Sequence, residues 1–170
     1  MKKLPNCEGL AASRVAFAWQ LHFSDKYEAC LQVLELVLTE QPALDIALTC
    51  KADTLIHLER YEEAFVITGT LLESNRANGD AWKIRGNLFA AKHDWIGLLK
   101  NCSRWLAHVS EDSKSRFDAF QHLAVAYCAL GRTREMEVWI KAWANFGTRK
   151  RNLDSIRRAV FRRAGKESPK

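Results

Sequence analysis

The sequence predicts an all-α protein built from about four antiparallel helix pairs and a C-terminal helix that caps them. The first observation is residues 80–97, which have the pattern of one helix, a short turn and the start of a second helix. The second is that copies of this unit lie on both sides of it. The third is composition. Three Pro and eight Gly among 170 residues suit helices joined by short turns, and a hydrophobic content of 48% is ample for a folded core.

The spacing of apolar residues defines the first helix of the 80–97 unit. Trp82, Gly86 and Phe89 are four and then three residues apart, so they share one helix face. Gly in a helix interior costs roughly 1 kcal/mol relative to Ala. This cost indicates that a neighbouring helix comes very close at Gly86.

This unit repeats with a period of 34 residues toward the N-terminus. Three columns keep their character: small (Ala18, Ala52, Gly86), large apolar (Leu21, Leu55, Phe89) and aromatic (Tyr27, Tyr61, Trp95). Toward the C-terminus a step of 38 residues places Ala124 in the small column and Tyr127 in the large one. The four extra residues fall in the polar stretch 109–116, which we expect to be a loop. A period in this range is typical of repeat architectures.

Over roughly residues 11–146 these columns resemble the tetratricopeptide repeat (TPR) family. In that family a 34-residue unit forms two antiparallel helices. A small residue at the eighth position lets them pack tightly, and an aromatic residue opens the second helix. Pro42 matches the proline that ends such a unit. The resemblance implies a right-handed superhelical stack, a TPR-like solenoid. The chain departs from the pattern at Thr133, which replaces the aromatic residue, and units two and three lack the closing proline.

The register predicts the elements in order. Residues 1–10 form a flexible tail, and the four units cover about 11–42, 45–76, 79–110 and 117–146. In units one and two we expect helices over 11–23, 27–40, 43–58 and 61–74. In units three and four we expect helices from 80, from 95 to near 108, over 115–130 and over 133–145. Ser24 or Asp25 is the expected N-cap of the helix at 27, and Asp80 that of unit three.

Residues 147–170 are predicted to form a basic amphipathic capping helix and a tail. This segment holds nine Lys or Arg and two Asp or Glu, net +7, whereas the rest of the chain holds seventeen and eighteen, net −1. An apolar stripe of Leu153, Ile156 and Val160 can cover unit four. The basic patch consists of Arg149, Lys150, Arg151, Arg157, Arg158, Arg162 and Arg163. Two interpretations stay open: a solenoid cap with a polar outer face, or a cap that also binds an acidic protein, RNA or DNA.

The resemblance also implies a binding groove, because in the family the first helices of each pair line a concave face that holds a partner's peptide or helix. By position, the groove candidates are Trp19, His22, Phe23, Asp53, His57, Lys83, Asn87, Gln121 and His122, with Val15, Thr49, Cys50, Ala90 and Val125 beside them. Ordinary core packing is the alternative for Trp19 and Phe23. Lys83 and Asn87 resemble the start of the carboxylate clamp of chaperone-binding repeats. The next unit has His122 where that clamp needs Asn, so we interpret them as general polar groups of the groove.

No motif for catalysis is present, and we expect no enzyme, no cofactor and no metal site. The five histidines show no metal-binding spacing such as His-Glu-x-x-His, and phosphate-loop, nucleophile-elbow and dinucleotide-binding patterns do not occur. His57 and His122 can share the groove, which alone indicates no chemistry.

Cysteine usage points to a reducing compartment. The five cysteines are odd in number and show no Cys-x-x-Cys pair, which favours buried free thiols and a cytoplasmic location. No stretch approaches the roughly 20 apolar residues of a membrane span, and the residues after Met1 lack the apolar run of a signal peptide. We expect an adaptor or chaperone that binds a protein segment in its groove. The alternative is a nucleic-acid-associated factor that acts through residues 149–166.

Overall fold

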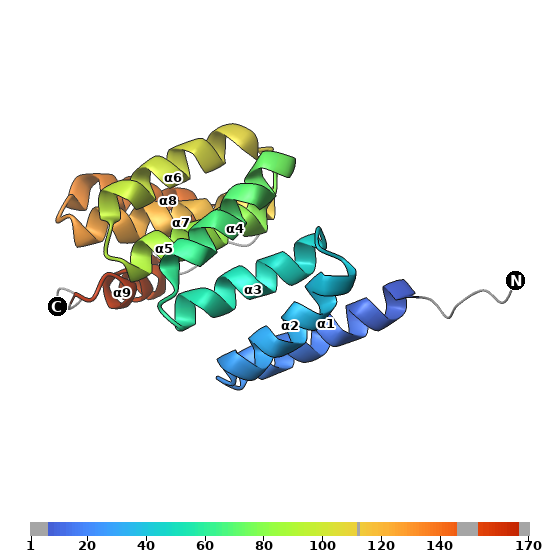
Figure 1. Ribbon diagram of the computed structural model, residues 1–170. Coiled ribbons are helices and arrows are strands. Elements are labelled where there is room, and N and C mark those ends of the chain that lie inside the picture. The colour runs from blue at the N-terminus through green and yellow to red at the C-terminus, as the bar shows by residue number, and fades with distance from the viewer. Residues whose placement is uncertain (1–6, 112, 146–152, 167–170) are drawn as a thin grey trace, which may run out of the picture. The chain divides into compact units, whose positions relative to one another are not determined.

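The computed structural model describes residues 7–111, 113–145 and 153–166 (Figure 1). These residues form nine α-helices and no strand, which confirms the all-α prediction. The chain divides into two compact units, α1–α4 and α5–α9, with the boundary after Ser74. Within each unit, consecutive helices pack against one another. In the described part of the chain, no helix combines the length and apolarity that a bilayer span requires.

The first unit consists of α1 (Cys7–Phe23), α2 (Tyr27–Glu40), α3 (Asp45–His57) and α4 (Tyr61–Ser74). The second helix of each pair begins at its predicted aromatic residue, Tyr27 or Tyr61. Helix α1 packs on both α2 and α3. It begins four residues earlier than expected, so residues 7–10 belong to the helix rather than to the tail, whose residues 1–6 lie outside the described part.

The second unit consists of α5 (Gly79–Ala91), α6 (Trp95–His108), α7 (Lys114–Ala129), α8 (Thr133–Asn145) and α9 (Leu153–Arg163). Helix α7 is central, because it packs on α5, α6, α8 and α9 (Figure 1). The side chain of Trp105 on α6 is fully buried, and its indole N–H donates to the hydroxyl of Ser115 at 2.6 Å.

The 34-residue period appears in the structure as a repeated turn inside each helix pair. In all four turns a residue with positive φ follows the first helix: Asp25, Glu59, His93 or Gly131. The N–H of the next residue then bonds to a carbonyl oxygen of the large apolar column, at Leu21, Leu55, Phe89 or Tyr127. This is the hydrogen-bond pattern of the Schellman motif, which closes a helix C-terminus.

Two predicted N-caps are wrong, and this turn explains the first of them. Asp25 is the left-handed residue that ends α1, so it is not in position to cap α2. Lys26 is the N-cap without a side-chain hydrogen bond, and the carboxylate of Asp25 instead accepts from the hydroxyl of Tyr27 at 2.6 Å. The cap of α5 is Asn78, whose side chain accepts from the N–H of Ala81 at 3.0 Å, and Asp80 lies in the first turn.

The predicted close approach at Gly86 is confirmed. A Cβ at this position would lie 2.9 Å from Cδ2 of His122 on α7 and 3.5 Å from Nδ2 of Asn101 on α6. The other residues of the small column, Ala18, Ala52 and Ala124, are fully buried. The small column therefore marks where helices come close together.

Helix α9 covers α7 and α8, as expected for a cap. Ile156 and Val160 of the predicted stripe are buried, and Arg149, Lys150 and Arg151 of the basic patch lie outside the described residues. The thiols of Cys30, Cys50, Cys102 and Cys128 are buried and free, and burial raises the pKa of Cys102.

Candidate functional site

The second unit contains a pocket of about 530 Å³ that is formed by α5, α7 and α9. Its lining residues are Lys83, Asn87 and Ala90 from α5, Asp118, Gln121, His122 and Val125 from α7, and Arg163 from α9. Six of these eight are the groove residues that the repeat register assigned to the third and fourth units. The structure thus brings together, in one concave site, side chains that are more than 30 residues apart in sequence.

His122 forms a buried wall of this pocket, and both of its ring nitrogens face oxygens of the fold. Nδ1 lies 2.7 Å from the backbone oxygen of Asp118, and Nε2 lies 3.0 Å from Oδ1 of Asn87. Burial lowers the pKa of His122, and the positive charges of Arg163 and Lys83 add to this effect. Burial therefore favours a neutral His122 near pH 7. The backbone oxygen of Asp118 only accepts, so Nδ1 carries the hydrogen, and Nε2 is satisfied when the Asn87 amide turns its NH₂ group toward it.

The charges of the pocket do not cancel. Nζ of Lys83 lies 3.6 Å from Oδ2 of Asp118, which neutralises that pair. Arg163 is exposed and has no hydrogen bond or ion pair with any residue that the structure describes. One positive charge is therefore left over at the rim. Asp118 was not among the sequence candidates. Its position one helical turn before His122 is the signal that could have found it.

In the first unit, the structure brings together all five groove candidates of the first two repeats. Trp19 and Phe23 stack on each other with ring centroids 5.6 Å apart, and both contact the ring of His22. Phe23 is 77% exposed, so core packing does not account for it, whereas Trp19 is half-buried against the core. Tyr27, which the sequence analysis assigned only a structural place, stacks on His57 at 4.8 Å.

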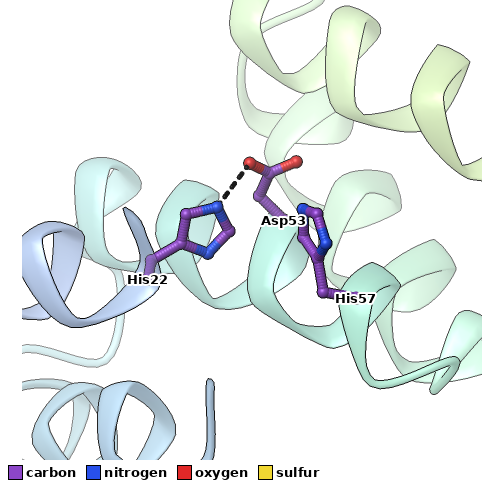
Figure 2. Close-up of side chains that lie close together, drawn as sticks. All are labelled: His22, Asp53 and His57. Atoms are coloured by element: carbon purple, nitrogen blue, oxygen red, sulfur yellow. Dashed lines mark ion pairs between the residues drawn. The ribbon is translucent and has the colours of Figure 1, made fainter. Parts of the chain in front are cut away.

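His22, Asp53 and His57 form the polar centre of this cluster, and Figure 2 shows their side chains converging from α1 and α3. Nε2 of His22 lies 3.4 Å from Oδ2 of Asp53, and its Nδ1 lies 3.0 Å from the hydroxyl oxygen of Thr54. Burial lowers the pKa of His22, while the carboxylate of Asp53 opposes that shift. No sequence pattern marks Thr54, because a threonine in an apolar helix run gives no signal of its own.

The basic patch on α9 is only partly free. The guanidinium of Arg157 donates two hydrogen bonds of 2.8 Å to Glu137 on α8 and one of 3.1 Å to Asp154. This fork raises the pKa of Arg157 and lowers that of Glu137. Arg157 therefore ties α9 to α8 instead of presenting a free charge. Arg158, Arg162 and Arg163 are exposed and have no ion pair with a described residue.

Comparison with protein-family models, with curated proteins and with solved structures gives no match to this chain. Its function is therefore inferred from its own residues.

Proposed function

We propose that this protein is a non-enzymatic adaptor or chaperone, built on TPR-like helix pairs, that holds a segment of a partner protein in the pocket of its second unit. The observation that carries the proposal is the lining of that pocket. Six side chains that the repeat register placed on a binding groove line one concave site on α5 and α7. The repeated Schellman turns support the register on which this assignment depends.

The chemistry of the pocket favours an acidic segment. Among the described residues, Arg163 carries the one charge in the lining that no neighbouring group offsets, because Lys83 is already paired with Asp118. A carboxylate placed beside Arg163 would form charge-assisted hydrogen bonds, which are about twice as strong as neutral ones. Ala90 and Val125 offer apolar contact to the methylene groups of the same side chain. The ligand is thus an extended segment with an Asp, a Glu or a terminal carboxylate at the contact point.

Selection from a library of random-sequence peptides displayed on phage tests this proposal. We expect wild-type protein to enrich peptides that contain acidic residues, and Arg163→Glu to bind them at least about 10-fold more weakly, a difference of about 1.4 kcal/mol. Arg162→Glu is the matched control. It makes the same charge change one residue earlier on α9, where the side chain is exposed and does not line the pocket.

Two results would reject the proposal. One is enrichment without any preference for acidic residues. The other is equal loss of binding in the Arg162 and Arg163 variants, which would indicate a general charge effect instead of a pocket. Circular dichroism of each variant confirms that the helices are intact.

A nucleic-acid partner for α9 is the second candidate, because Arg158, Arg162 and Arg163 are exposed without ion pairs among the described residues. Phosphate contacts would make log affinity fall with log salt at roughly −0.9 per duplex phosphate. Replacing these three arginines by Gln would abolish that slope and leave Arg157 in its structural ion pair. We expect no appreciable binding at physiological salt, and steep, salt-sensitive binding that the triple variant loses would favour this candidate instead.

The buried free thiols agree with a reducing compartment, and we propose the cytoplasm as the place where the protein acts. Thiol counting on native and denatured protein tests this, since a native disulfide would contradict it.

A further inference from the structure

We propose that His22, Asp53 and His57 form a binding site for a divalent first-row transition-metal ion such as Zn²⁺, with one coordination position open to water or to a partner's side chain. Each residue offers one ligand atom, and the three atoms lie within 4.8 Å of one another. All three belong to the first unit, so the inference is independent of the pocket in the second unit and goes beyond the proposed function.

The ligand spacing fits the geometry of zinc. Two ligand atoms that each lie about 2.0–2.1 Å from a tetrahedral zinc ion are about 3.4 Å apart. Nε2 of His22 and Oδ2 of Asp53 are 3.4 Å apart without any adjustment. His57 lies four residues after Asp53 and therefore on the same face of α3. Its ligand atom already lies within 4.8 Å of the other two, and its exposed side chain has room to close that distance around an ion.

The tautomer of His22 is set by a relay of two hydrogen bonds, one between His22 and Thr54 and one from Thr54 to the backbone oxygen of Cys50. The hydroxyl of Thr54 has one hydrogen and donates it to the backbone oxygen of Cys50 at 2.8 Å. At the 3.0 Å contact the hydroxyl must therefore accept, and Nδ1 of His22 carries the hydrogen that it donates. A neutral His22 then points the unshared pair of Nε2 at the Asp53 carboxylate. Two electron-pair donors that face each other create a place for a cation.

This relay is the arrangement that metal-binding histidines require. A ligand histidine donates its second ring N–H to a neighbouring oxygen, which fixes the ring orientation and makes the ligand nitrogen more basic. Thr54 is fully buried and supplies that oxygen. The ring of His22 is further held by edge contacts with Trp19, Phe23 and Tyr27 at centroid distances of 5.3–5.5 Å.

Access to the site is from the side of His57. His22 is buried, Asp53 is half-buried and His57 is exposed, so the three ligands lead from the core to solvent. Among the described residues neither ring nitrogen of His57 has a hydrogen-bond partner, and its contacts are ring contacts with Tyr27 and His22. The hydroxyl of Tyr27 points away to Asp25 and does not occupy the site.

The ligand set decides the class of metal. Two imidazole nitrogens and one carboxylate oxygen suit Zn²⁺, Fe²⁺, Co²⁺ or Ni²⁺, whereas Ca²⁺ and Mg²⁺ prefer oxygen ligands alone. Three protein ligands also leave the fourth tetrahedral position free. A bound ion would tie α1 to α3, the two helices that supply the ligands, and its free position would accept a water or another donor group.

Calorimetric titration of the full-length, chelator-treated protein with ZnCl₂ tests the site. We expect one equivalent of Zn²⁺ to bind to the wild type. His57→Gln and Asp53→Asn should each weaken Zn²⁺ binding by more than about 100-fold. Loss of a residue that only hydrogen-bonds to a ligand already costs up to about 100-fold in metal affinity, and these variants remove a ligand itself. His57 is exposed, so its variant folds whatever the fate of other variants. His108→Gln is the matched control, because His108 is also an exposed helix residue but lies outside the cluster.

Thr54→Val separates the metal role from a merely structural one. The wild-type ligands all remain, yet loss of the relay should lower Zn²⁺ affinity by about 10- to 100-fold. Absence of stoichiometric binding to the wild type would overturn the proposal. Binding that is unchanged in His57→Gln, or lost equally in His108→Gln, would also overturn it, because the ion would then be held elsewhere.

Discussion

Two buried histidines, one in each unit, have opposite environments. His22 and His122 are 5% and 7% exposed, and burial lowers the pKa of both. The second nitrogen of His22 faces a carboxylate and a second histidine. The second nitrogen of His122 faces the side-chain amide of Asn87, whose NH₂ group can donate to it, and Lys83 and Arg163 lie nearby. We therefore propose the first histidine as a metal ligand and the second as a structural group.

On this proposal, burial alone does not distinguish a structural histidine from a ligand. In both residues one ring nitrogen contacts an oxygen of a helix, the hydroxyl of Thr54 or the backbone oxygen of Asp118. The group that faces the other ring nitrogen determines whether the histidine is structural or a ligand. An amide partner completes a hydrogen-bond network, whereas a carboxylate beside a further imidazole completes a ligand set.

The largest effect is expected from filling the space that His122 occupies beside α5. Gly86→Leu would place side-chain atoms within 2.9 Å of His122, so the ring must leave its position. Overpacking of this kind costs typically 1–3 kcal/mol, and we expect about 3 kcal/mol of unfolding free energy to be lost. Urea unfolding followed by tryptophan fluorescence measures it, because five of the six tryptophans belong to the second unit.

Ala107→Leu is the control for Gly86→Leu. Ala107 is exposed on α6 of the same unit, and the same side chain there should change stability by less than about 0.5 kcal/mol. A denaturation midpoint that Gly86→Leu leaves unmoved would contradict both the close helix contact and the repeat register built on it.

A smaller effect is expected from breaking the relay behind His22. Thr54→Val leaves the Nδ1 hydrogen of His22 without an acceptor in the core, which should cost about 1–2 kcal/mol. Thr68→Val is the control. Thr68 is equally buried, but among the described residues its hydroxyl bonds only to the backbone oxygen of Phe65 in its own helix. Hydrogen exchange of the amides in α1 and α3 should rise in the first variant and stay unchanged in the second. Equal effects would show that the relay is not important.

A pH dependence distinguishes the two histidines further. Because burial lowers the folded-state pKa of His122, the unfolded state binds more protons just below its own pKa of about 6.5. Stability of the second unit is therefore full above about pH 6.5 and falls as the pH drops from there toward the folded-state pKa. The groups that act on a proton at His122 are Asp118 on α7, Lys83 on α5 and Arg163 on α9.

His122→Gln should flatten this dependence between pH 6.5 and lower values. Urea midpoints of the wild type and the variant, compared at several pH values in that range, provide the measurement. A wild-type midpoint that rises on acidification would contradict a neutral, structural His122.

The smallest effect concerns α9. Arg157→Gln removes the two-pronged contact with Glu137 and should lower the thermal midpoint slightly, because the ion pair is partly exposed to solvent. Arg158→Gln removes an exposed charge without an ion pair among the described residues and should leave the midpoint unchanged. Equal midpoints in the two variants would show that the Arg157 contact contributes nothing.

The sequence predicted features that follow from a period and missed those that depend on contacts between distant residues. Small and aromatic columns located the close contact at Gly86 and the starts of α2, α4 and α6, because each recurs at a fixed spacing. The same register assigned six of the pocket residues. The predicted cap at Asp25 is wrong because a left-handed turn residue cannot also cap the next helix.

Two further features could not be predicted. The ion pair of Arg157 with Glu137 joins residues twenty positions apart across a segment with no repeat register, so no residue spacing predicts it. The grouping of His22 with Asp53 and His57 needs the packing of α1 on α3. All three were assigned to the groove from the register. That Nε2 of His22 faces the carboxylate of Asp53, however, depends on side-chain conformations in the folded protein.

Long-range nitrogen–proton NMR of the histidine side chains tests the central contrast most directly. At pH 7 the spectrum should show His22 with its hydrogen on Nδ1. One equivalent of Zn²⁺ should shift the ligand nitrogens of His22 and His57 while leaving both nitrogens of His122 in place. A hydrogen on Nε2 of His22, or zinc-induced shifts at His122 instead of at His22 and His57, would contradict the account.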